Sequence, residues 1–521
     1  METRSELHWN RMQRCFADRP ASISAHLAGV FRARGDALAL VDGEARVSFA
    51  ALDLQVRALA AALARCGVTR GDRVAIMLGN DADAIRAVLA VLWLGAVVVP
   101  VGTRSRAPEI AYLLGDAQAC LVIHAPEFRP ELPSSMPLAL ETGSSEWAAA
   151  LAGEPVAGPV DGVGEEDLFA ILYTSGTTGR PKGAMLTHLN VIHSSLHWIA
   201  AFELGAADRT LLCVPWTHVS GLCGVVMPFL HAGATIVVLR EFDRRAALEL
   251  AAREAITHAL MVPAMYGLCL LEPDLAAFAL GSWRIAAYGG APMPDATAGR
   301  FAKTFPSLAM CNCYGATETT SPATIMPPGE AGERLDSIGK VVRCGEIRVM
   351  DDAGREVVAG QTGELWIAGP MVVPGYWRNE AATRAAFAGG FWKSGDIGSV
   401  DAQGYVRIAD RKKDMIIRGG FKIYSAELEN VLAAIPGVVE AAVVGRPDSM
   451  MGETVVAFLC VSDPGLDAPK VRKWCETRVS DYKVPGEVVV SSDPLPRNAN
   501  GKIQKSDLRR RAAAPAGGVA I

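Results

Sequence analysis

The sequence lacks the features that mark several large classes of protein. Its 51 lysine and arginine residues face 56 acidic ones, so the formal net charge is −5 and no basic excess is there to attract a nucleic-acid backbone. The polar start, Met1-Glu2-Thr3-Arg4, has no apolar stretch of the kind that a secretory signal needs. We therefore expect neither a nucleic-acid partner nor export from the cell.

Long uninterrupted hydrophobic runs are also missing. The uncharged run Ala87–Val101 is short for a bilayer span and contains Gly95 and Pro100. A second run, Thr210–Leu239, is long enough, but prolines such as Pro215 break it, and its pattern favours a strand, a loop, a helix and a strand inside a core. We expect no transmembrane segment.

Metal-binding spacings are absent as well. The sequence has no Cys-x-x-Cys pair and no His-Glu-x-x-His motif, so we expect no structural zinc. The nearest alternative ligand sets are His188, His193 and His197, or Cys311 with Cys313. The eleven cysteines are an odd number, and most stand in apolar runs, as buried reduced thiols do. This pattern predicts a cytoplasmic protein.

What is present indicates an α/β protein of more than one folding unit. A chain of 521 residues exceeds the size at which one hydrophobic core usually stops growing. Short β-rich runs alternate with alanine- and leucine-rich helical stretches, which favours layered α/β sheets with mostly parallel strands. The predicted strands are Arg73–Leu78, Leu211–Val214, Thr235–Leu239, Ala259–Val262, Arg284–Tyr288 and Leu308–Cys313. Beyond about residue 340, Glu346–Met350 and Glu364–Ala368 suggest a smaller β-rich subdomain with antiparallel pairing.

The charged segment 410–414 separates this body from a tail with its own pattern. The tail has a helix from Ser425, strands at Val438–Val444 and Thr454–Val461, and a helix from Pro469. We therefore predict an N-terminal domain at 1–409, a hinge at 410–414 and a small α+β C-terminal domain at 415–521.

The most informative stretch runs from Tyr173 to Gly183 and reads Tyr-Thr-Ser-Gly-Thr-Thr-Gly-Arg-Pro-Lys-Gly. A loop of small residues that leaves a strand can point backbone N–H groups and hydroxyls at phosphate oxygens, and Lys182 adds a positive charge. A Walker loop would need Gly-Lys-Ser/Thr at its end, whereas here Pro181 precedes the lysine and Gly183 follows it. The stretch therefore predicts a phosphate cradle of a different kind.

This stretch resembles the phosphate-loop signature of the adenylate-forming superfamily of acyl- and aryl-CoA synthetases, peptide-synthetase adenylation domains and luciferases. Further motifs follow in family order, at 215–221, 289–292, 314–319, 392–396 and 494–502. The resemblance covers nearly the whole chain, with a few departures. Tyr288 replaces a small residue, Ser394 replaces threonine, and Asn498 and Asn500 stand where hydroxyl residues are common.

The resemblance implies a role for each motif. Tyr314 stacks on adenine, Glu318 holds Mg²⁺, Asp396 and Arg411 bind the ribose, Lys413 is the hinge, and Gly419 with Gly420 borders a coenzyme A channel. Catalytic roles fall on Thr178, Lys182, His218, Glu318 and Lys502. The remaining nucleotide contacts are Thr174, Ser175, Gly176, Thr177, Gly179, Gly289, Gly290, Ala291, Pro292, Gly315 and Thr317. The acyl pocket is lined by His218, Ser220, Gly224, Tyr288, Cys311 and Cys313.

These roles predict a ligase that uses ATP, Mg²⁺ and coenzyme A to convert a carboxylic acid into an acyl-adenylate and then a thioester. The pocket residues are neutral apart from His218, which favours an apolar acid, either medium-chain fatty or aryl, over a dicarboxylate. Two alternatives stay open: a ligase that charges a carrier protein in trans, and a non-catalytic regulator that binds adenine nucleotides. The sequence leaves open whether the protein is a monomer or a homodimer.

Overall fold

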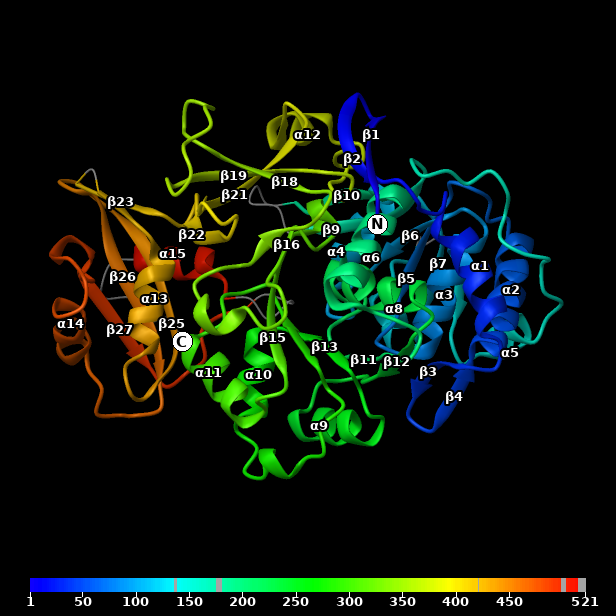
Figure 1. Cartoon of the computed structure of the whole chain (residues 1–521), viewed down its shortest axis with the longest axis horizontal. Helices are drawn as coiled ribbons and strands as arrows, with labels where there is room; N and C mark the ends of the chain where they lie inside the picture. The colour runs from blue at the N-terminus through cyan, green and yellow to red at the C-terminus, as the bar shows by residue number, and fades with distance from the viewer. Residues whose placement is uncertain (135–137, 175–179, 420, 498–502, 514–521) are drawn as a thin grey trace. The chain divides into compact units, whose positions relative to one another are not determined.

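The computed structural model describes residues 1–134, 138–174, 180–419, 421–497 and 503–513 (Figure 1). The chain divides into two compact units. The first comprises Met1–Ile347, Trp366–Lys393 and Gly404–Val406, and the second comprises Arg348–Leu365, Ser394–Gln403 and Arg407–Ile521. The second unit thus takes in segments that precede residue 410, and the hinge at 410–414 stays a prediction.

A nine-stranded sheet forms the larger framework of the first unit, in the order β17-β16-β15-β14-β13-β11-β12-β3-β4. The six strands from β15 to β3 are parallel, whereas β4, β16 and β17 run antiparallel to their neighbours. The bounds are β3 Leu38–Asp42, β4 Ala45–Ser48, β11 Arg209–Leu212, β12 Thr235–Val238, β13 His258–Met261, β14 Ile285–Tyr288, β15 Ala309–Tyr314, β16 Thr324–Ile325 and β17 Lys340–Val341.

A second sheet of the same unit has the order β10-β9-β6-β5-β7-β8. Its strands are parallel except that β10 runs antiparallel to β9. The bounds are β5 Arg73–Met77, β6 Val97–Pro100, β7 Ala119–His124, β8 Leu138–Glu141, β9 Leu168–Thr174 and β10 Lys182–Thr187. A separate hairpin joins β1 (Thr3–His8) and β2 (Arg11–Phe16). These sheets confirm the predicted α/β class.

Helices pack around both sheets, and serine or aspartate caps start several of them. Ser22, Ser48 and Asp81 each accept a hydrogen bond from the amide three residues on, which satisfies a free N–H of the first turn. Helix α2 packs against α1, α3 and α5, drawn in blue tones in Figure 1. The bounds are α1 Ile23–Arg34, α2 Phe49–Arg65, α3 Ala82–Trp93, α4 Ala107–Ala117, α5 Ser145–Leu151, α6 His188–Phe202, α7 Val219–Gly221, α8 Met227–His231, α9 Arg244–Arg253, α10 Pro263–Cys269, α11 Asp295–Thr304 and α12 Glu380–Ala386.

A third sheet has the order β18-β19-β21-β20, with β22 beside β21. Its bounds are β18 Glu346–Met350, β19 Gly363–Ala368, β20 Phe387–Ala388, β21 Phe391–Val400 and β22 Val406–Arg411. The second unit also contains a sheet in the order β24-β23-β26-β25, with β27 parallel to β26. Helices α13 and α15 pack on β25, and α14 packs on β27. The bounds are β23 Ile416–Arg418, β24 Phe421–Ile423, β25 Val438–Asp448, β26 Gly452–Val461, β27 Glu487–Ser491, α13 Ser425–Ala433, α14 Ala468–Glu476 and α15 Lys505–Ala513.

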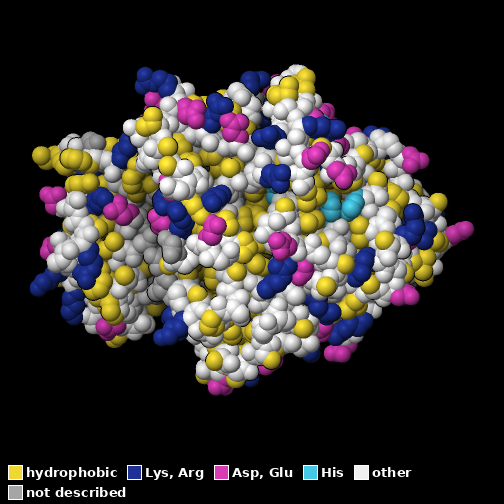
Figure 2. All heavy atoms as spheres, in the orientation of Figure 1, with side chains coloured by type: hydrophobic (Ala, Val, Ile, Leu, Met, Phe, Trp, Pro, Cys, Tyr) yellow, Lys and Arg dark blue, Asp and Glu magenta, His cyan; other side chains and the backbone are white. Residues whose placement is uncertain are grey.

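The surface charges are mixed in sign, as the balanced composition of the sequence predicts. Figure 2 shows acidic and basic side chains interspersed over the face in view. Among the described residues, no helix combines the length and the apolarity needed to cross a bilayer.

Candidate active site

Three predicted site segments follow the carboxyl ends of strands in the nine-stranded sheet. Segment 215–221 comes after β11, segment 289–292 comes directly after β14, and segment 314–319 begins at the last residue of β15. Because β15, β14, β13 and β11 are consecutive parallel neighbours, their carboxyl ends share one edge. Open α/β sheets bind ligands at this edge. The fold therefore brings the three segments to one side of the first unit.

The turn after β14 is shaped by two glycines. A Cβ atom at Gly289 would lie 2.3 Å from the carbonyl oxygen of Cys313, so the backbones of the two neighbouring turns approach closer than any side chain allows. Gly290 has a φ of +79°, in the left-handed region that favours glycine. Beyond it, Ala291 and Pro292 are exposed. The turn thus offers bare backbone to a flat ligand.

The segment after β15 forms a tight turn that presents Glu318. Residues Thr317–Thr319 make one turn of 3₁₀ helix, and the backbone N–H of Ala316 donates to Oγ1 of Thr319 over 2.9 Å. Tyr314, Gly315, Thr317 and Glu318 are all half-buried, so they remain reachable from solvent. A carboxylate in such a position has the hard oxygen atoms that Mg²⁺ prefers.

Tyr376 contacts both Lys182 of the predicted phosphate loop and Glu318, the predicted Mg²⁺ ligand, and sequence reasoning missed it. Its hydroxyl donates to Oε1 of Glu318 over 2.8 Å, while Nζ of Lys182 lies 5.4 Å from the centre of its ring. Burial, and then the charge of Glu318, raise the pKa of Tyr376 well above its usual range, so the hydroxyl stays a donor. The structure thus brings a cation and a carboxylate to one aromatic side chain.

The loop that carries Tyr376 is tied down from distant parts of the chain. Asn190, in the first turn of α6, donates through Nδ2 to the carbonyl oxygens of Pro370 (2.7 Å) and Val372 (3.2 Å). The backbone N–H of Val373 donates to the carbonyl oxygen of Glu318 over 2.9 Å. Both ends of the Glu318–Tyr376 contact are therefore held by the backbone as well as by side chains.

The predicted phosphate loop connects β9 and β10. Thr174 and Lys182 face each other in the register of this antiparallel pair, whereas Ser175, Gly176, Thr177, Thr178 and Gly179 lie outside the described residues. The flanks are fixed: the hydroxyl of Tyr173 donates to Asp116 over 2.6 Å, and that of Tyr112 donates to the carbonyl oxygen of Pro181 over 3.0 Å. Lys182 thus stands at the start of a well-anchored strand.

His218 begins the helical segment that borders the predicted acyl pocket. The segment continues through α7, a π-helical turn at Leu222–Val226 and α8. Such wide turns are rare and often lie at functional sites. Trp216, just before His218, is buried and donates through Nε1 to the carbonyl oxygen of Leu78 over 2.9 Å, which anchors the entry to the helix. The π-helical turn was not predicted from sequence.

The other predicted pocket residues divide into half-buried and buried ones. Ser220 is half-buried, whereas Gly224 is buried, and a Cβ atom on it would come within 2.9 Å of Leu260. Tyr288, Cys311 and Cys313 are buried at 4% exposure or less. Burial raises the pKa of the Cys311 thiol to about 12, so it stays neutral. The buried members of this predicted pocket are therefore uncharged.

The second unit holds the predicted ribose pair. Asp396, in β21, is buried, and its Oδ1 lies 3.4 Å from Nε of the exposed Arg411, at the end of β22. Lys413 follows two residues later and is exposed. Gly419 has a φ of +57° and precedes β24, while Gly420 and Lys502 lie outside the described residues.

Two of the three histidines considered as zinc ligands, His188 and His193, have other hydrogen-bond partners. Nδ1 of His188 accepts a hydrogen bond from the backbone N–H of Ile23, and Nε2 of His193 accepts one from Phe16, each over 3.2 Å. Burial lowers the pKa of both imidazoles to about 4, so they stay neutral acceptors. His197 is also fully buried. These side chains dock the N-terminal segment onto α6.

A second group of metal-ligand types occurs in the N-terminal hairpin. Glu6, His8 and Cys15 bring one donor atom each within 4.8 Å of one another. The guanidinium of Arg19 donates to both carboxylate oxygens of Glu6, over 2.9 Å and 2.6 Å. A positive charge thus already neutralises the carboxylate, which makes the group an ion-pair cluster.

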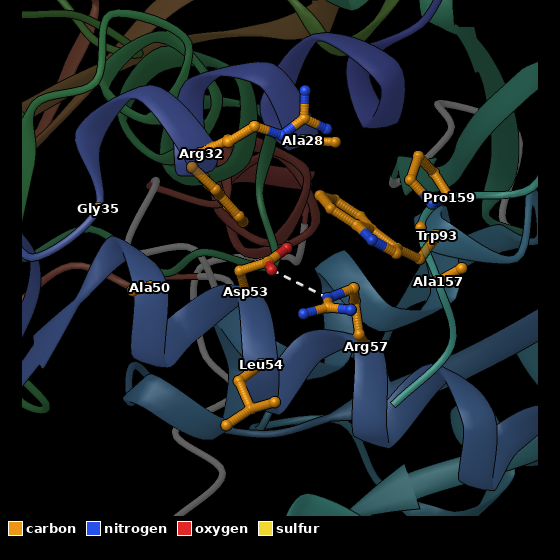
Figure 3. Close-up of a pocket in the computed structure, with 12 residues that line it drawn as sticks. Ala28, Arg32, Gly35, Ala50, Asp53, Leu54, Arg57, Trp93, Ala157 and Pro159 are labelled. Atoms are coloured by element: carbon orange, nitrogen blue, oxygen red, sulfur yellow. Dashed lines mark hydrogen bonds and ion pairs between the residues drawn. The ribbon is translucent and has the colours of Figure 1, made fainter. Parts of the chain in front are cut away.

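A surface cavity of about 480 Å³ lies away from these residues (Figure 3). It is lined by residues of α1 and α2, by Trp93 of α3 and by residues 157–159, and in its wall Nε of Arg57 lies 2.9 Å from the carboxylate of Asp53. None of the predicted site residues contributes to its wall.

Comparison with known proteins identifies the family. The model of the AMP-binding enzyme family matches residues 28–377, and that of the AMP-binding enzyme C-terminal domain matches residues 427–502. A feruloyl-CoA synthase of an Amycolatopsis species is 35% identical over 479 residues, which cover 91% of this chain and 96% of that protein. The long-chain-fatty-acid–CoA ligase FadD13 of Mycobacterium tuberculosis is 32% identical and covers 90% of this chain and 94% of its own.

Solved structures give the same result. The crystal structure of ATP-bound MatB from Rhodopseudomonas palustris superposes with a TM-score of 0.86 at 32% identity, covering 94% of this chain and 99% of that one. Together the two family models match most of the chain, and so does each of the two relatives, in agreement with the order of motifs in the sequence. The chain belongs to the family of AMP-binding, adenylate-forming enzymes and is a ligase of the acyl- or aryl-CoA synthetase type.

Proposed function

We propose that this protein activates an apolar monocarboxylic acid with ATP as the acyl-adenylate and transfers the acyl group to coenzyme A. The observation that supports this most directly is the group of Lys182, Tyr376 and Glu318, in which the cation of Lys182 and the carboxylate of Glu318 both contact the side chain of Tyr376. A nucleotide triphosphate needs these two kinds of group, one for its own charge and one for its metal ion.

A carboxylate does not transfer its acyl group directly, because oxide is a very poor leaving group. Its oxygen therefore first attacks the α-phosphorus of ATP, and pyrophosphate leaves. Lys182 and the loop 174–179 take up negative charge on the departing phosphates, and the hydroxyl of Tyr376 keeps Glu318 aimed at the site. Bound Mg²⁺ would supply a second positive charge beside those oxygens, and the half-buried carboxylate of Glu318 fits it. Lys502 bridges the carboxylate and the α-phosphate. No covalent intermediate with the protein is required.

In the second half-reaction the thiol of coenzyme A attacks the mixed anhydride and AMP leaves. We assign adenine binding to Tyr314 and the turn 289–292, ribose binding to Asp396 and Arg411, and the coenzyme A channel to Gly419 and Gly420. Between the two steps, a rotation about Lys413 removes Lys502 from the active site and brings the residues of this channel to it. The eleven cysteines are all free, which supports a cytoplasmic location for these reactions.

The uncharged residues that we assign to the acyl pocket support this substrate class. Tyr288, Cys311 and Cys313 are buried, and an acid with a second carboxylate would find no cation among them to offset its desolvation. Two of the sequence relatives are named for feruloyl-CoA and for long-chain fatty acids, which are an aryl and a fatty acyl group. We therefore propose a medium-chain fatty or aryl acid as the substrate.

The test is to supply ATP, Mg²⁺ and coenzyme A with a panel of aryl, fatty and dicarboxylic acids and to measure AMP, pyrophosphate and thioester. Apolar monocarboxylic acids should give all three products, and dicarboxylic acids should give little. Glu318→Gln should abolish pyrophosphate release, whereas Glu380→Gln, which alters an exposed ion pair with Arg384 in the same unit, should not. ADP with inorganic phosphate as the products would refute adenylate formation.

The same assay decides between the alternatives. Pyrophosphate release without a coenzyme A thioester would favour a ligase that charges a carrier protein. ATP binding without pyrophosphate release for any acid would favour the non-catalytic regulator.

A further inference from the structure

A buried polar cluster in the second unit joins the predicted hinge to two helices. Asp410 is 4% exposed and Ser425 is fully buried. The backbone N–H of Ser425 donates to Oδ2 of Asp410, and its hydroxyl donates to Oδ1 over 3.1 Å. Nζ of Lys505 donates to the same hydroxyl over 2.7 Å, so Ser425 bridges the carboxylate and the ammonium group.

The cluster has a second carboxylate. Oε1 of Glu429, one turn further along α13, lies 2.7 Å from Nζ of Lys505 and also accepts a hydrogen bond from the backbone N–H of Val443 over 2.8 Å. Burial raises the pKa of both Asp410 and Glu429, and the charge of Lys505 opposes that shift. Charged groups persist inside a protein when they are paired in this way, and removing one partner is costly.

The contacts of this cluster differ in whether they join residues on opposite sides of the predicted hinge at Lys413. Asp410 precedes Lys413 by three residues, whereas Ser425, Glu429 and Lys505 all follow it. If the C-terminal segment turns about Lys413, the bonds from Ser425 to Asp410 must break or form. The Lys505–Glu429 pair lies wholly beyond the hinge and turns as one piece. The contact between Ser425 and Asp410 therefore depends on the turn about Lys413, whereas the contact between Lys505 and Glu429 does not.

We propose that Asp410, Ser425 and Lys505 form a hinge latch, which holds one of the two orientations of the C-terminal segment and so acts as a set of positioning residues for Lys502 and Arg411. This inference rests on the proposed function, because it assumes a turn about Lys413. Two features make the latch suited to this task. Lys505 starts α15 only three residues after Lys502, and Oδ1 of Asp410 also accepts the backbone N–H of Arg411 over 2.7 Å.

A latch has a different kinetic signature from a structural anchor. Weakening a bond that exists in one orientation changes the population of that orientation, and so it affects the two half-reactions unequally. Weakening a bond that exists in both orientations reduces both half-reactions together. The variant Asp410→Asn removes the charge with little change of shape, and Glu429→Gln is its matched control on the far side of the hinge.

The experiment measures pyrophosphate release in the first half-reaction and thioester formation from synthetic acyl-adenylate in the second. We expect Asp410→Asn to change the ratio of the two rates at least tenfold, and Glu429→Gln to leave the ratio within about twofold. Ser425→Ala, which removes the bridging hydroxyl, should change the ratio in the same direction. Lys505→Ala should also change the ratio, and Lys505→Arg, which keeps the positive charge, should change it less. Equal losses in both half-reactions for Asp410→Asn and Ser425→Ala would overturn the latch.

A second measurement does not depend on turnover. Hydrogen exchange of peptides that contain Ser425 should differ between the free protein, the protein with ATP and the protein with an acyl-adenylate analogue, because the amide of Ser425 keeps its acceptor in one orientation only. In folded Asp410→Ala this difference should vanish. If the wild-type protein binds ATP but makes no adenylate, the proposed reaction fails while this measurement still tests the latch. Identical exchange of the Ser425 amide in all ligand states would refute it.

Discussion

The contact between Tyr376 and Glu318 makes a sharp test of how the site is organised. Tyr376→Phe removes one hydroxyl, which donates over 2.8 Å to Glu318 from a side chain that is only 6% exposed. Hydrogen bonds to charged groups contribute about 1.5–3 kcal/mol, and water cannot easily replace a donor in a buried position. If the contact is fully expressed in the transition state, this corresponds to about 10- to 150-fold in rate.

The assay is pyrophosphate release as a function of Mg²⁺ concentration, together with the thermal unfolding of each variant. We expect Tyr376→Phe to need more Mg²⁺ and to lose at least tenfold in rate, since Glu318 is no longer aimed. Tyr405→Phe is the matched control, because Tyr405 also donates to a carboxylate, that of Glu330, and neither residue belongs to the predicted site. A folded Tyr376→Phe variant with an unchanged rate and Mg²⁺ dependence would refute our account.

Three further predictions concern Gly289, His193 and Lys502. Gly289→Ala should cost most of the activity because its Cβ would lie 2.3 Å from the oxygen of Cys313, whereas Gly299→Ala, with open space around it in α11, should leave the steady-state rate intact. Because burial lowers the folded-state pKa of His193 to about 4, the unfolded chain takes up a proton as the pH falls below about 6.5; the melting temperature should therefore drop between pH 6.5 and pH 4, and less so in His193→Gln. Lys502→Ala should slow pyrophosphate release by about two to three powers of ten yet leave thioester formation from synthetic acyl-adenylate near normal, and equal losses in both would contradict its assigned role.

The core strands could be predicted from the sequence, but the positions of their ends could be predicted only approximately. Thr235–Leu239 was predicted and β12 covers Thr235–Val238, whereas Leu211–Val214 was predicted and β11 covers Arg209–Leu212. The apolar run continues past β11 because Cys213 and Val214 are buried in the loop that leads to Trp216. Hydrophobicity reports burial, and at the carboxyl ends of these strands buried residues continue into the loops.

The site was predictable where its residues form contiguous motifs. The turn 289–292 and the segment 314–319 can be found from local sequence, and parallel strand order then brings them together. The π-helical turn at Leu222–Val226 has no comparable signal, because its apolar residues would suit an ordinary helix equally well. The contact of Tyr376 with Glu318 joins residues 58 positions apart, and no local pattern around either one indicates the other.

The N-terminal hairpin shows how far such non-local support extends. Arg11, in β2, donates to the carbonyl oxygens of Val373 (3.3 Å) and Pro374 (3.1 Å), and its guanidinium lies 5.0 Å from the ring centre of Phe387. The same loop carries Tyr376, so both the hairpin and Asn190 hold it. The family match begins only at residue 28, yet the residues before it reach Glu318 through two contacts. The geometry of the candidate site therefore depends on a segment that neither the motifs nor the family match includes.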